Sequence, residues 1–497
     1  MTTVYGQATI ETTTLVGTEP VPVEVQVDVA SGLPGFSIVG LGDAAVLEAR
    51  ERVRAALRSA GFRFPNARVV VNLAPGPLRK HGTGFDLPIA LGVLAATAQI
   101  PSELWAGRRA VGELSLDGAV RSVPGMLAHA LGARRDRVPL LGPLASVHLA
   151  AGLPELEYHG ISSLHRLPLD ERPSAPIRRC ATADHGPDLG EVTGLETARR
   201  ALEIAAAGGL SLLFIGPPGS GKTMLARRLG PILPPLEGEE RIDTGLVHSV
   251  AGLDEAPALS GQRPFRAPHH SASLAGLVGG GSPPRPGEVS LAHNGVLFLD
   301  ELPEFAPSAL QSLRQPMEDG WVSLVRAEGR IRFPARFTLI AAANPCPCGY
   351  LGDPVKVCRC TEAAVNRYQG RIGGPLMDRI DMAVSVERID PSLLVRGSDG
   401  ECSARVRERV CGAREYALAA SRPLASLLSG SELVGSCQFD AGTRQTLADV
   451  GRRHHLSGRA VTRLMRVART VADLDASPVV RTAHVMEALG FRREDLR

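Results

Sequence analysis

The sequence predicts an α/β fold with a mostly parallel central sheet, preceded by a smaller α/β unit and followed by an all-helical unit. From Val192 to about Asp390, segments of strand character alternate with helical ones, as in sheets whose strands are joined by helices. Three short runs in this region are wholly apolar, as is typical of strands buried on both faces: Leu210–Ile215, Gly295–Leu299 and Phe337–Ala342. Beyond about Pro391 the pattern turns helical, with Arg-rich amphipathic segments such as Gly458–Leu474.

The amino-terminal region predicts its own α/β unit. A strand-like alternation, a charged helix, a β-branched run and an apolar helix follow one another: Val23–Val29, Ala44–Ala60, Arg68–Leu73 and Leu87–Ala96. A stretch rich in proline and arginine without periodicity comes next and predicts a linker. We therefore expect four segments, at residues 1–166, 167–190 (the linker), 191–390 and 391–497.

Composition narrows the class of protein. With 497 residues, 44% hydrophobic and 22% charged, the chain is typical of multi-domain globular proteins. The formal net charge of +3 neither requires nor excludes nucleic acid, so any basic surface must be local. The amino terminus carries no signal-peptide pattern, and the longest apolar stretch is too short to span a bilayer. We expect a cytoplasmic protein without a membrane partner, whose eight cysteines are mostly reduced.

A phosphate-binding loop follows the first apolar run of the central region. It matches the P-loop pattern and precedes a predicted helix, Thr223–Leu229, an arrangement that makes a chance glycine turn improbable. Backbone N–H groups of such a loop face the β-phosphate, the lysine reaches the β- and γ-phosphates, and the threonine hydroxyl ligates magnesium. The ATP-binding residues are therefore predicted to be Gly216, Pro217, Pro218, Gly219, Ser220, Gly221, Lys222 and Thr223.

Two carboxylates end the second apolar run, and an amide ends the third. Behind a P-loop, the first carboxylate, Asp300, is placed to hold magnesium, and Glu301 to act as the general base on the attacking water. Asn344 could orient the same water, although an asparagine before Pro345 is also a common turn residue.

These elements, in this order, resemble the AAA+ superfamily, and longer motifs narrow the resemblance. Phe265–Ser273, Gly279–Ser282, Arg285–Gly295 and Asn344–Tyr350 are similar to the magnesium-chelatase-like ATPases and, within them, to the ComM/YifB family. The resemblance covers nearly the whole chain. It implies an AAA+ core with chelatase-type inserts, a helical lid, and a magnesium-dependent ATPase that forms hexamers.

Specific arginines are expected from the resemblance. Arg379 falls where an arginine finger reaches a neighbouring subunit's γ-phosphate, and Arg459 where the lid supplies a second sensor arginine. Arg463, one helical turn on, is a rival for that second role. A surface salt bridge is the alternative reading of Arg379 and Arg459.

The amino-terminal unit is similar to the Lon-type protease domain (ribosomal S5 domain 2-like), which uses a Ser–Lys dyad. Gly84 stands in the serine's place and Leu127 in the lysine's. Thr83 adjoins the nucleophile position, but no partner for it is evident from the sequence. Since an activated hydroxyl needs a base, we expect this unit to keep the fold without protease activity.

Four cysteines form two closely spaced Cys-x-Cys pairs, Cys346/Cys348 and Cys358/Cys360. Four thiolates this close can bind zinc tetrahedrally, and we favour zinc over four free thiols in a loop. Two adjacent histidines, His269 and His270, have no carboxylate at the spacing of a metal site. We therefore assign them to structure or to a contact between subunits.

Two functions remain after these assignments. The ComM/YifB resemblance implies an ATP-driven hexameric DNA motor, with helicase or branch-migration activity on single-stranded or branched DNA during natural transformation or recombination. A predicted hairpin, Val322–Phe333, fits this function, because Arg326, Arg330 and Arg332 could follow a phosphate backbone. The alternative is a chelatase- or chaperone-like ATPase that remodels a protein partner.

Overall fold

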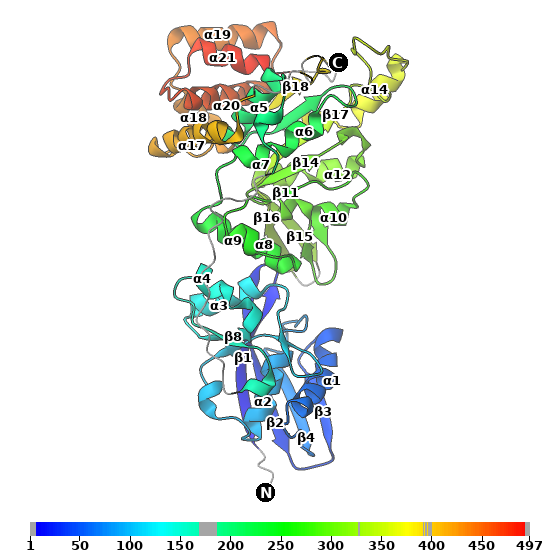
Figure 1. Ribbon diagram of the computed structural model, residues 1–497, viewed down its shortest axis with the longest axis vertical. Coiled ribbons are helices and arrows are strands. Elements are labelled where there is room, and N and C mark those ends of the chain that lie inside the picture. Colours follow the sequence, from blue (N-terminus) through cyan, green and yellow to red (C-terminus); the bar gives the residue numbers. More distant parts are fainter. Residues whose placement is uncertain are drawn as a thin grey trace.

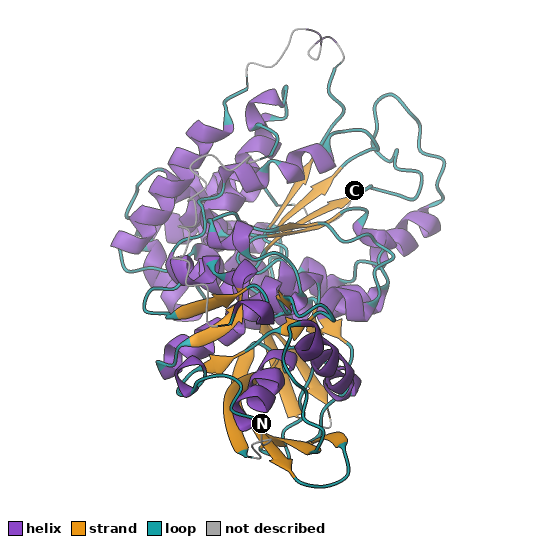
Figure 2. Ribbon diagram, turned by 60° about the horizontal axis from the view of Figure 1, so that its bottom comes forward, coloured by secondary structure: helices purple, strands orange, loops and turns teal. Residues whose placement is uncertain are grey.

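The computed structural model describes residues 6–167, 186–326, 329–390, 392, 395 and 400–492. The molecule is long, with the amino-terminal unit at one end and a layer of helices at the other (Figure 1). Strands occupy the two α/β units, and helices lie around them (Figure 2). The predicted α/β class, with a parallel sheet and a helical carboxyl-terminal region, is confirmed.

The amino-terminal unit is built on a seven-stranded mixed sheet of order β3-β4-β2-β1-β5-β8-β9. Its long antiparallel strands alternate buried and exposed residues, as expected where one face packs on a core. The strands are β1 (Gln7–Val16), β2 (Glu19–Ala30), β3 (Gly35–Val39), β4 (Arg68–Ala74), β5 (Arg109–Ala110), β8 (Leu140–Pro143) and β9 (Tyr158–Ile161). Its helices include α1 (Ala44–Ser59), α2 (Asp86–Ala96), α3 (Met126–Asp136) and α4 (His148–Gly152), and a small ribbon pairs β6 (Glu113–Leu114) with β7 (Val120–Arg121).

The central unit contains a parallel sheet of order β11-β14-β17-β10-β18. All three predicted apolar strands belong to it, and the residues of the strands as formed are buried. The strands are β10 (Leu212–Ile215), β11 (Phe265–Arg266), β14 (Val296–Leu299), β17 (Thr338–Ala343) and β18 (Met382–Ser385).

Helices and short ribbons connect these strands. They include α5 (Glu196–Gly208), α6 (Lys222–Arg227), α7 (Leu229–Ile232), α8 (Gly238–Ala251), α9 (Ala256–Leu259), α10 (Leu274–Val278), α11 (Glu288–Leu291), α12 (Pro307–Ser312), α13 (Arg314–Asp319), α14 (Glu362–Gly370) and α15 (Gly374–Met377). The helix expected over Thr223–Leu229 is shorter than predicted, because α6 ends at Arg227 and a new turn of helix begins at Leu229. A predicted hairpin is confirmed as the antiparallel pair β15 (Trp321–Arg326) and β16 (Gly329–Pro334), and β12 (Gly279–Gly280) pairs with β13 (Arg285–Pro286).

The carboxyl-terminal helices share an apolar core with the central unit. They are α17 (Ser403–Ala419), α18 (Gly430–Cys437), α19 (Ala441–Arg453), α20 (Gly458–Leu474) and α21 (Thr482–Gly490), and α20 has the predicted bounds. One continuous cluster joins α5 and β10 to α17 and α20. The carboxyl-terminal helices are therefore packed on the central unit through α5.

The amino-terminal unit touches the central unit at several places, one of them the approach of His148 in α4 to Glu255 (3.5 Å). Just before α3, the backbone N–H of Gly125 donates to the carbonyl of Ser249 in α8 (2.7 Å), and Leu127 of α3 packs beside Gly245. The turn between β1 and β2 also contacts the central unit, because a Cβ on Gly17 would lie 2.7 Å from Cγ2 of Ile331 in β16. The hairpin β15–β16 thus lies at the junction of the two units (Figure 1).

Most of the predicted linker, residues 168–185, lies outside the described residues. Its last residues are tied to the lid, since Ser403 N–H donates to the carboxylate of Asp188 at 3.2 Å and Leu189 N–H donates to the Ser403 hydroxyl at 2.7 Å. Among the helices of the described ranges, none has the length and apolar character needed to span a bilayer.

Candidate functional site

The phosphate loop lies at the carboxyl end of β10, between β17 and β18. Gly219 and Gly221 adopt positive φ angles of 79° and 94°, which glycine reaches without strain. A Cβ on Gly216 would lie 2.1 Å from the carbonyl oxygen of Val386. The glycines therefore allow the loop to curl tightly against the sheet, with α6 beginning at Lys222.

The ammonium group of Lys222 is held inside this loop. It donates to the carbonyls of Gly216 (2.7 Å) and Pro217 (2.9 Å), and to Oδ1 of Asn344 at 3.2 Å. Burial lowers the pKa of Lys222 to about 8, and the nearby carboxylates of Asp300 and Glu301 oppose that shift. An anionic phosphate at this place would favour the charged amine further.

Two carboxylates face the loop from the end of β14. The Thr223 hydroxyl donates to Oδ2 of Asp300 at 2.7 Å, so two hard oxygen ligands of the kind magnesium prefers stand together. Glu301 has φ 52° and ψ 47°, a left-handed conformation that is strained for a residue with a side chain. Its side chain is 55% exposed and is available to a water molecule in front of the loop.

His270 contacts Glu301, which the sequence did not reveal. Its Nδ1 lies 3.4 Å from Oε2 of Glu301, and its ring stacks on His269 with centroids 4.0 Å apart. The structure thus places His270 beside the carboxylate predicted to act as the base. The two residues are 31 positions apart in sequence and meet because β11, two residues long, pairs with β14.

The sulfur atoms of the four clustered cysteines lie close together. All four Sγ atoms are within 4.8 Å of one another, with Cys346–Cys348 at 3.4 Å and Cys358 at 3.6 Å from each. Tetrahedral zinc with bonds of 2.3 Å separates its sulfur ligands by about 3.8 Å. The observed sulfur cage fits a zinc ion.

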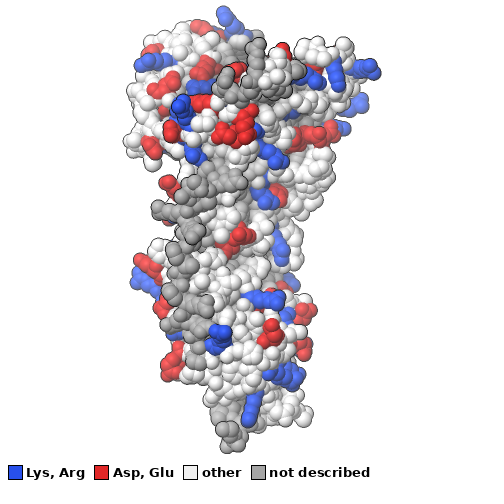
Figure 3. Space-filling view, viewed as in Figure 1, with Lys and Arg blue, Asp and Glu red and all other residues white. Residues whose placement is uncertain are grey.

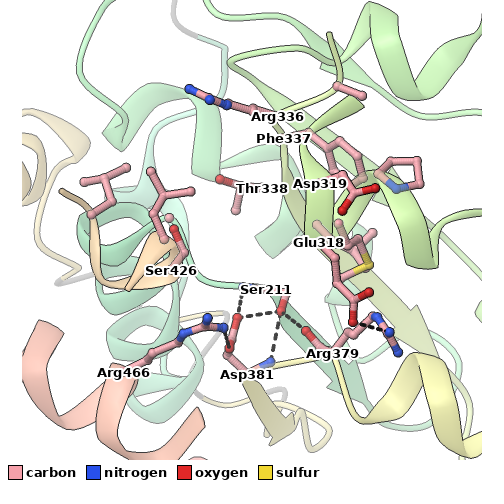
Figure 4. Close-up of a pocket in the computed structure, with 18 of the residues that line it drawn as sticks. Ser211, Glu318, Asp319, Arg336, Phe337, Thr338, Arg379, Asp381, Ser426 and Arg466 are labelled. Atoms are coloured by element: carbon pink, nitrogen blue, oxygen red, sulfur yellow. Dashed lines mark hydrogen bonds and ion pairs between the residues drawn. The ribbon is translucent and has the colours of Figure 1, made fainter. Parts of the chain in front are cut away.

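Arg379 lies at the opposite edge of the sheet from the phosphate loop. Ser211, just before β10, donates its hydroxyl to the backbone carbonyl of Arg379 (2.8 Å) and accepts from Asp381 N–H. Gly216 follows Ser211 by five residue steps of extended chain, roughly 16 Å, so Arg379 does not reach its own phosphate loop. Its guanidinium pairs with Glu318 (Figure 4) and also donates to the Pro375 carbonyl.

The two lid arginines stand at this same edge. Arg463 donates to the carbonyls of Met377 (2.8 Å) and Ile380 (2.7 Å), whereas Arg459 is 65% exposed and lies 3.5 Å from Asp378. A cavity of about 770 Å³ opens here between the core and the lid. The arginines that line it are Arg263, Arg336, Arg379, Arg414, Arg459, Arg463 and Arg466.

The hairpin presents two arginines to solvent. Arg330 and Arg332 are exposed and pair across the ladder with Val325 and Ser323, which places them on one face of the ribbon. Arg326 pairs with Gly329 in the backbone ladder. The turn residues 327–328 and the Arg326 side chain lie outside the described residues.

The dyad positions of the amino-terminal unit are apolar. A Cβ on Gly84 would meet Val111 at 3.4 Å and Val123 at 3.7 Å, and Leu127 is fully buried against α8. Thr83, however, has a partner: its hydroxyl donates to Oε2 of Glu113, and this corrects the expectation that it stands alone. At the two positions that a Ser–Lys dyad would occupy, the chain thus has packing in place of a nucleophile and an amine.

Comparison with known families covers all three described parts of the chain. The family "Magnesium chelatase, subunit ChlI" matches residues 188–394. "Subunit ChlI of Mg-chelatase" matches residues 25–141, and "Magnesium chelatase, subunit ChlI C-terminal" matches residues 400–492.

Full-length relatives agree with these matches. The chain is 42% identical to YifB of Salmonella typhimurium, over 98% of this chain and 97% of that protein. It is 39% identical to the competence protein ComM of Haemophilus influenzae, over 98% and 97% of the two chains, and 43% identical to Rv2897c of Mycobacterium tuberculosis, over 96% of each. The chain therefore belongs to the magnesium-chelatase-like AAA+ ATPases, in the ComM/YifB family.

Proposed function

We propose that the chain is the subunit of a hexameric, ATP-driven DNA motor of the cytoplasm, which moves single-stranded or branched DNA during recombination or the integration of incoming DNA. The observation that carries this proposal is the hairpin β15–β16. Its exposed Arg330 and Arg332 stand on a ribbon outside the main sheet. The likeness to a relative named a competence protein supports the same reading.

ATP hydrolysis is assigned to groups at the carboxyl edge of the sheet. Lys222 and the loop N–H groups bind the phosphates, and Glu301 takes the proton of the attacking water. Asn344, already hydrogen bonded to Lys222, orients that water. Thr223 and Asp300 would hold magnesium, which supplies positive charge to the developing transition state.

A ring is needed to complete this site. Because Arg379 and Arg459 lie at the far edge of the sheet from their own phosphate loop, each can act on a phosphate only in a neighbouring copy. Between the lid candidates, Arg463 is occupied by two backbone carbonyls, while Arg459 is largely free to reorient. We therefore assign the finger to Arg379 and the lid sensor to Arg459.

The charge distribution suits a local DNA contact. Lys and Arg are interspersed with Asp and Glu along the face shown in Figure 3. Affinity for DNA phosphates must then come from a few arginines on each subunit. A ring of six subunits brings six copies of them together around its pore. The alternative, remodelling of a protein partner, is favoured by the match to chelatase subunits.

Replacing Arg330 and Arg332 with alanine is expected to weaken DNA binding in the presence of ATP. The slope of log affinity against log salt should fall by about one unit for each lost phosphate contact, while basal ATP hydrolysis should persist. Anisotropy titrations with labelled single-stranded and forked DNA at several salt concentrations measure both quantities.

The matched control is Arg58→Ala with Arg63→Ala, two exposed arginines of the amino-terminal unit. An unchanged affinity and salt slope for the hairpin variant would favour the protein-remodelling alternative. So would the absence of any DNA binding by the unaltered protein with ATP.

We also propose that the four clustered cysteines hold one structural zinc. Four thiolates with no open position form a closed site of the structural kind. Purified protein should contain about one zinc per chain, and the double change Cys346→Ser, Cys348→Ser should lose it.

Elemental analysis of the purified protein gives the zinc content. Cys402→Ser is the control, since Cys402 is exposed and is not one of the four clustered thiols. A protein without zinc, in which all four thiols react freely, would argue against the site.

A further inference from the structure

The cysteine-containing loop, residues 345–361, lies directly on the ATP-binding loop. An ideal Cβ on Gly349 would stand 2.5 Å from Cδ and 2.7 Å from Cγ of Pro218, and 3.8 Å from Cγ of Asn344. Such distances leave no room for a side chain, so the backbone at Gly349 is packed against the proline ring. Gly349 therefore touches both the phosphate loop and the end of β17.

The position of Gly349 is set by the cysteines on one side. Gly349 follows Cys348 in the chain, and its N–H donates to the carbonyl of Cys346 at 2.9 Å. Cys346 is fully buried and stands two residues after Asn344. The carbonyl of the intervening Pro345 accepts from Gln369 of α14 at 2.9 Å.

The other side of the loop is tied to the sheet. The Tyr350 ring lies within 5.0 Å of Lys356 Nζ and 5.7 Å of the Arg388 guanidinium. Arg388 also donates to Asp353 at 2.7 Å, and it follows β18, which neighbours β10. These contacts fix the loop around Tyr350 and Asp353. A metal on the four cysteines would therefore fix the remaining segment, which faces Pro218.

We propose that this loop is a zinc-held wall of the ATP site: zinc on the four cysteines presses Gly349 against Pro218 and sets Asn344 beside Lys222, so ATP affinity and turnover depend on zinc occupancy. The inference rests on the zinc site proposed above. Physically, four metal–sulfur bonds replace the many conformations open to a loop with four free thiols. Loss of the metal releases the contact with Pro218 and the position of Asn344 together.

Two glycine variants isolate the contact without touching the cysteines. Gly349 and Gly352 have similar positive φ angles, 84° and 78°, but a Cβ on Gly352 meets nothing within 4 Å. Both alanine variants thus carry the same kind of backbone strain, and only Gly349→Ala adds a clash with a rigid ring. We expect Gly349→Ala to retain zinc and to bind a fluorescent ATP analogue about tenfold more weakly than Gly352→Ala.

Zinc removal from the unaltered protein is the second arm. After treatment with a zinc-selective chelator and return to magnesium buffer, the affinity for the analogue and the kcat for ATP should both fall, and added zinc should restore them. Thermal unfolding followed by circular dichroism shows whether each sample remains folded, and only samples that remain folded are used to judge the inference.

If the purified protein contains no zinc, the zinc site itself is refuted. If zinc is present, either of two results overturns the inference. The first is that Gly349→Ala and Gly352→Ala bind the ATP analogue equally well, and the second is that removing zinc changes neither nucleotide affinity nor turnover.

Discussion

Replacing Glu301 with glutamine should leave ATP bound and slow its hydrolysis by about 10²–10⁴-fold. The amide has nearly the shape of the carboxylate but does not accept the proton of the attacking water. Binding should survive because the contacts to the phosphates come from the loop of Lys222 and not from Glu301. Phosphate release measures turnover, and a fluorescent ATP analogue measures affinity.

Two further variants serve as controls for this result. Lys222→Ala should lose ATP binding itself, since it removes the one buried cation inside the loop. Glu304→Gln changes a carboxylate three positions on that pairs with Arg371 at 3.3 Å, and it should turn over ATP normally. Near-normal hydrolysis by the Glu301→Gln protein would refute the assignment of the base.

Arg379→Ala should reduce ATP turnover by about 10³-fold, the effect of losing an arginine finger. The alternative reading is a salt bridge with Glu318, and a matched variant separates the two. Glu318→Ala breaks the same ion pair but leaves the guanidinium in place, so turnover should remain close to normal. Equal losses in both variants would show that the ion pair, and not the finger, is what matters.

Mixed rings test whether Arg379 acts on a neighbour. An Arg379→Ala subunit keeps an intact Glu301, and a Glu301→Gln subunit keeps an intact Arg379. In random rings, roughly one interface in four combines the two intact groups, so the mixture should regain activity that neither variant has alone. Differently tagged subunits that copurify establish mixing, and mixed rings without any recovery would make Arg379 structural.

The local hydrophobic pattern of the sequence was sufficient to predict the strands and the helix that position the site. The apolar runs before Gly216, Asp300 and Asn344 became neighbouring parallel strands, because burial on both faces leaves an unbroken hydrophobic run in the sequence. The lid helix Gly458–Leu474 was likewise readable from its period. Since carboxyl ends of parallel strands meet at one edge, these three strands place the phosphate loop, the carboxylates and the amide together.

Contacts between distant segments were not readable from the sequence. The pairing of His270 with Glu301 depends on β11, which is too short to give a strand signal. The hydrogen bond from Thr83 to Glu113 joins residues 30 positions apart through the tertiary fold. Arg379 and Arg459 lie at the edge of the sheet opposite the phosphate loop because of how the lid packs on the core. Periodicity within a helix does not encode that packing.

The most direct test of a DNA motor is the ATPase rate of the purified protein with and without DNA. Phosphate release is measured at fixed ATP and magnesium, first alone, then with single-stranded DNA and with forked DNA. A motor whose hairpins grip DNA should hydrolyse ATP severalfold faster with either substrate, and the Arg330→Ala, Arg332→Ala protein should keep the basal rate while losing the stimulation. Rates that are identical with and without DNA, at low salt where phosphate contacts are strongest, would contradict the account.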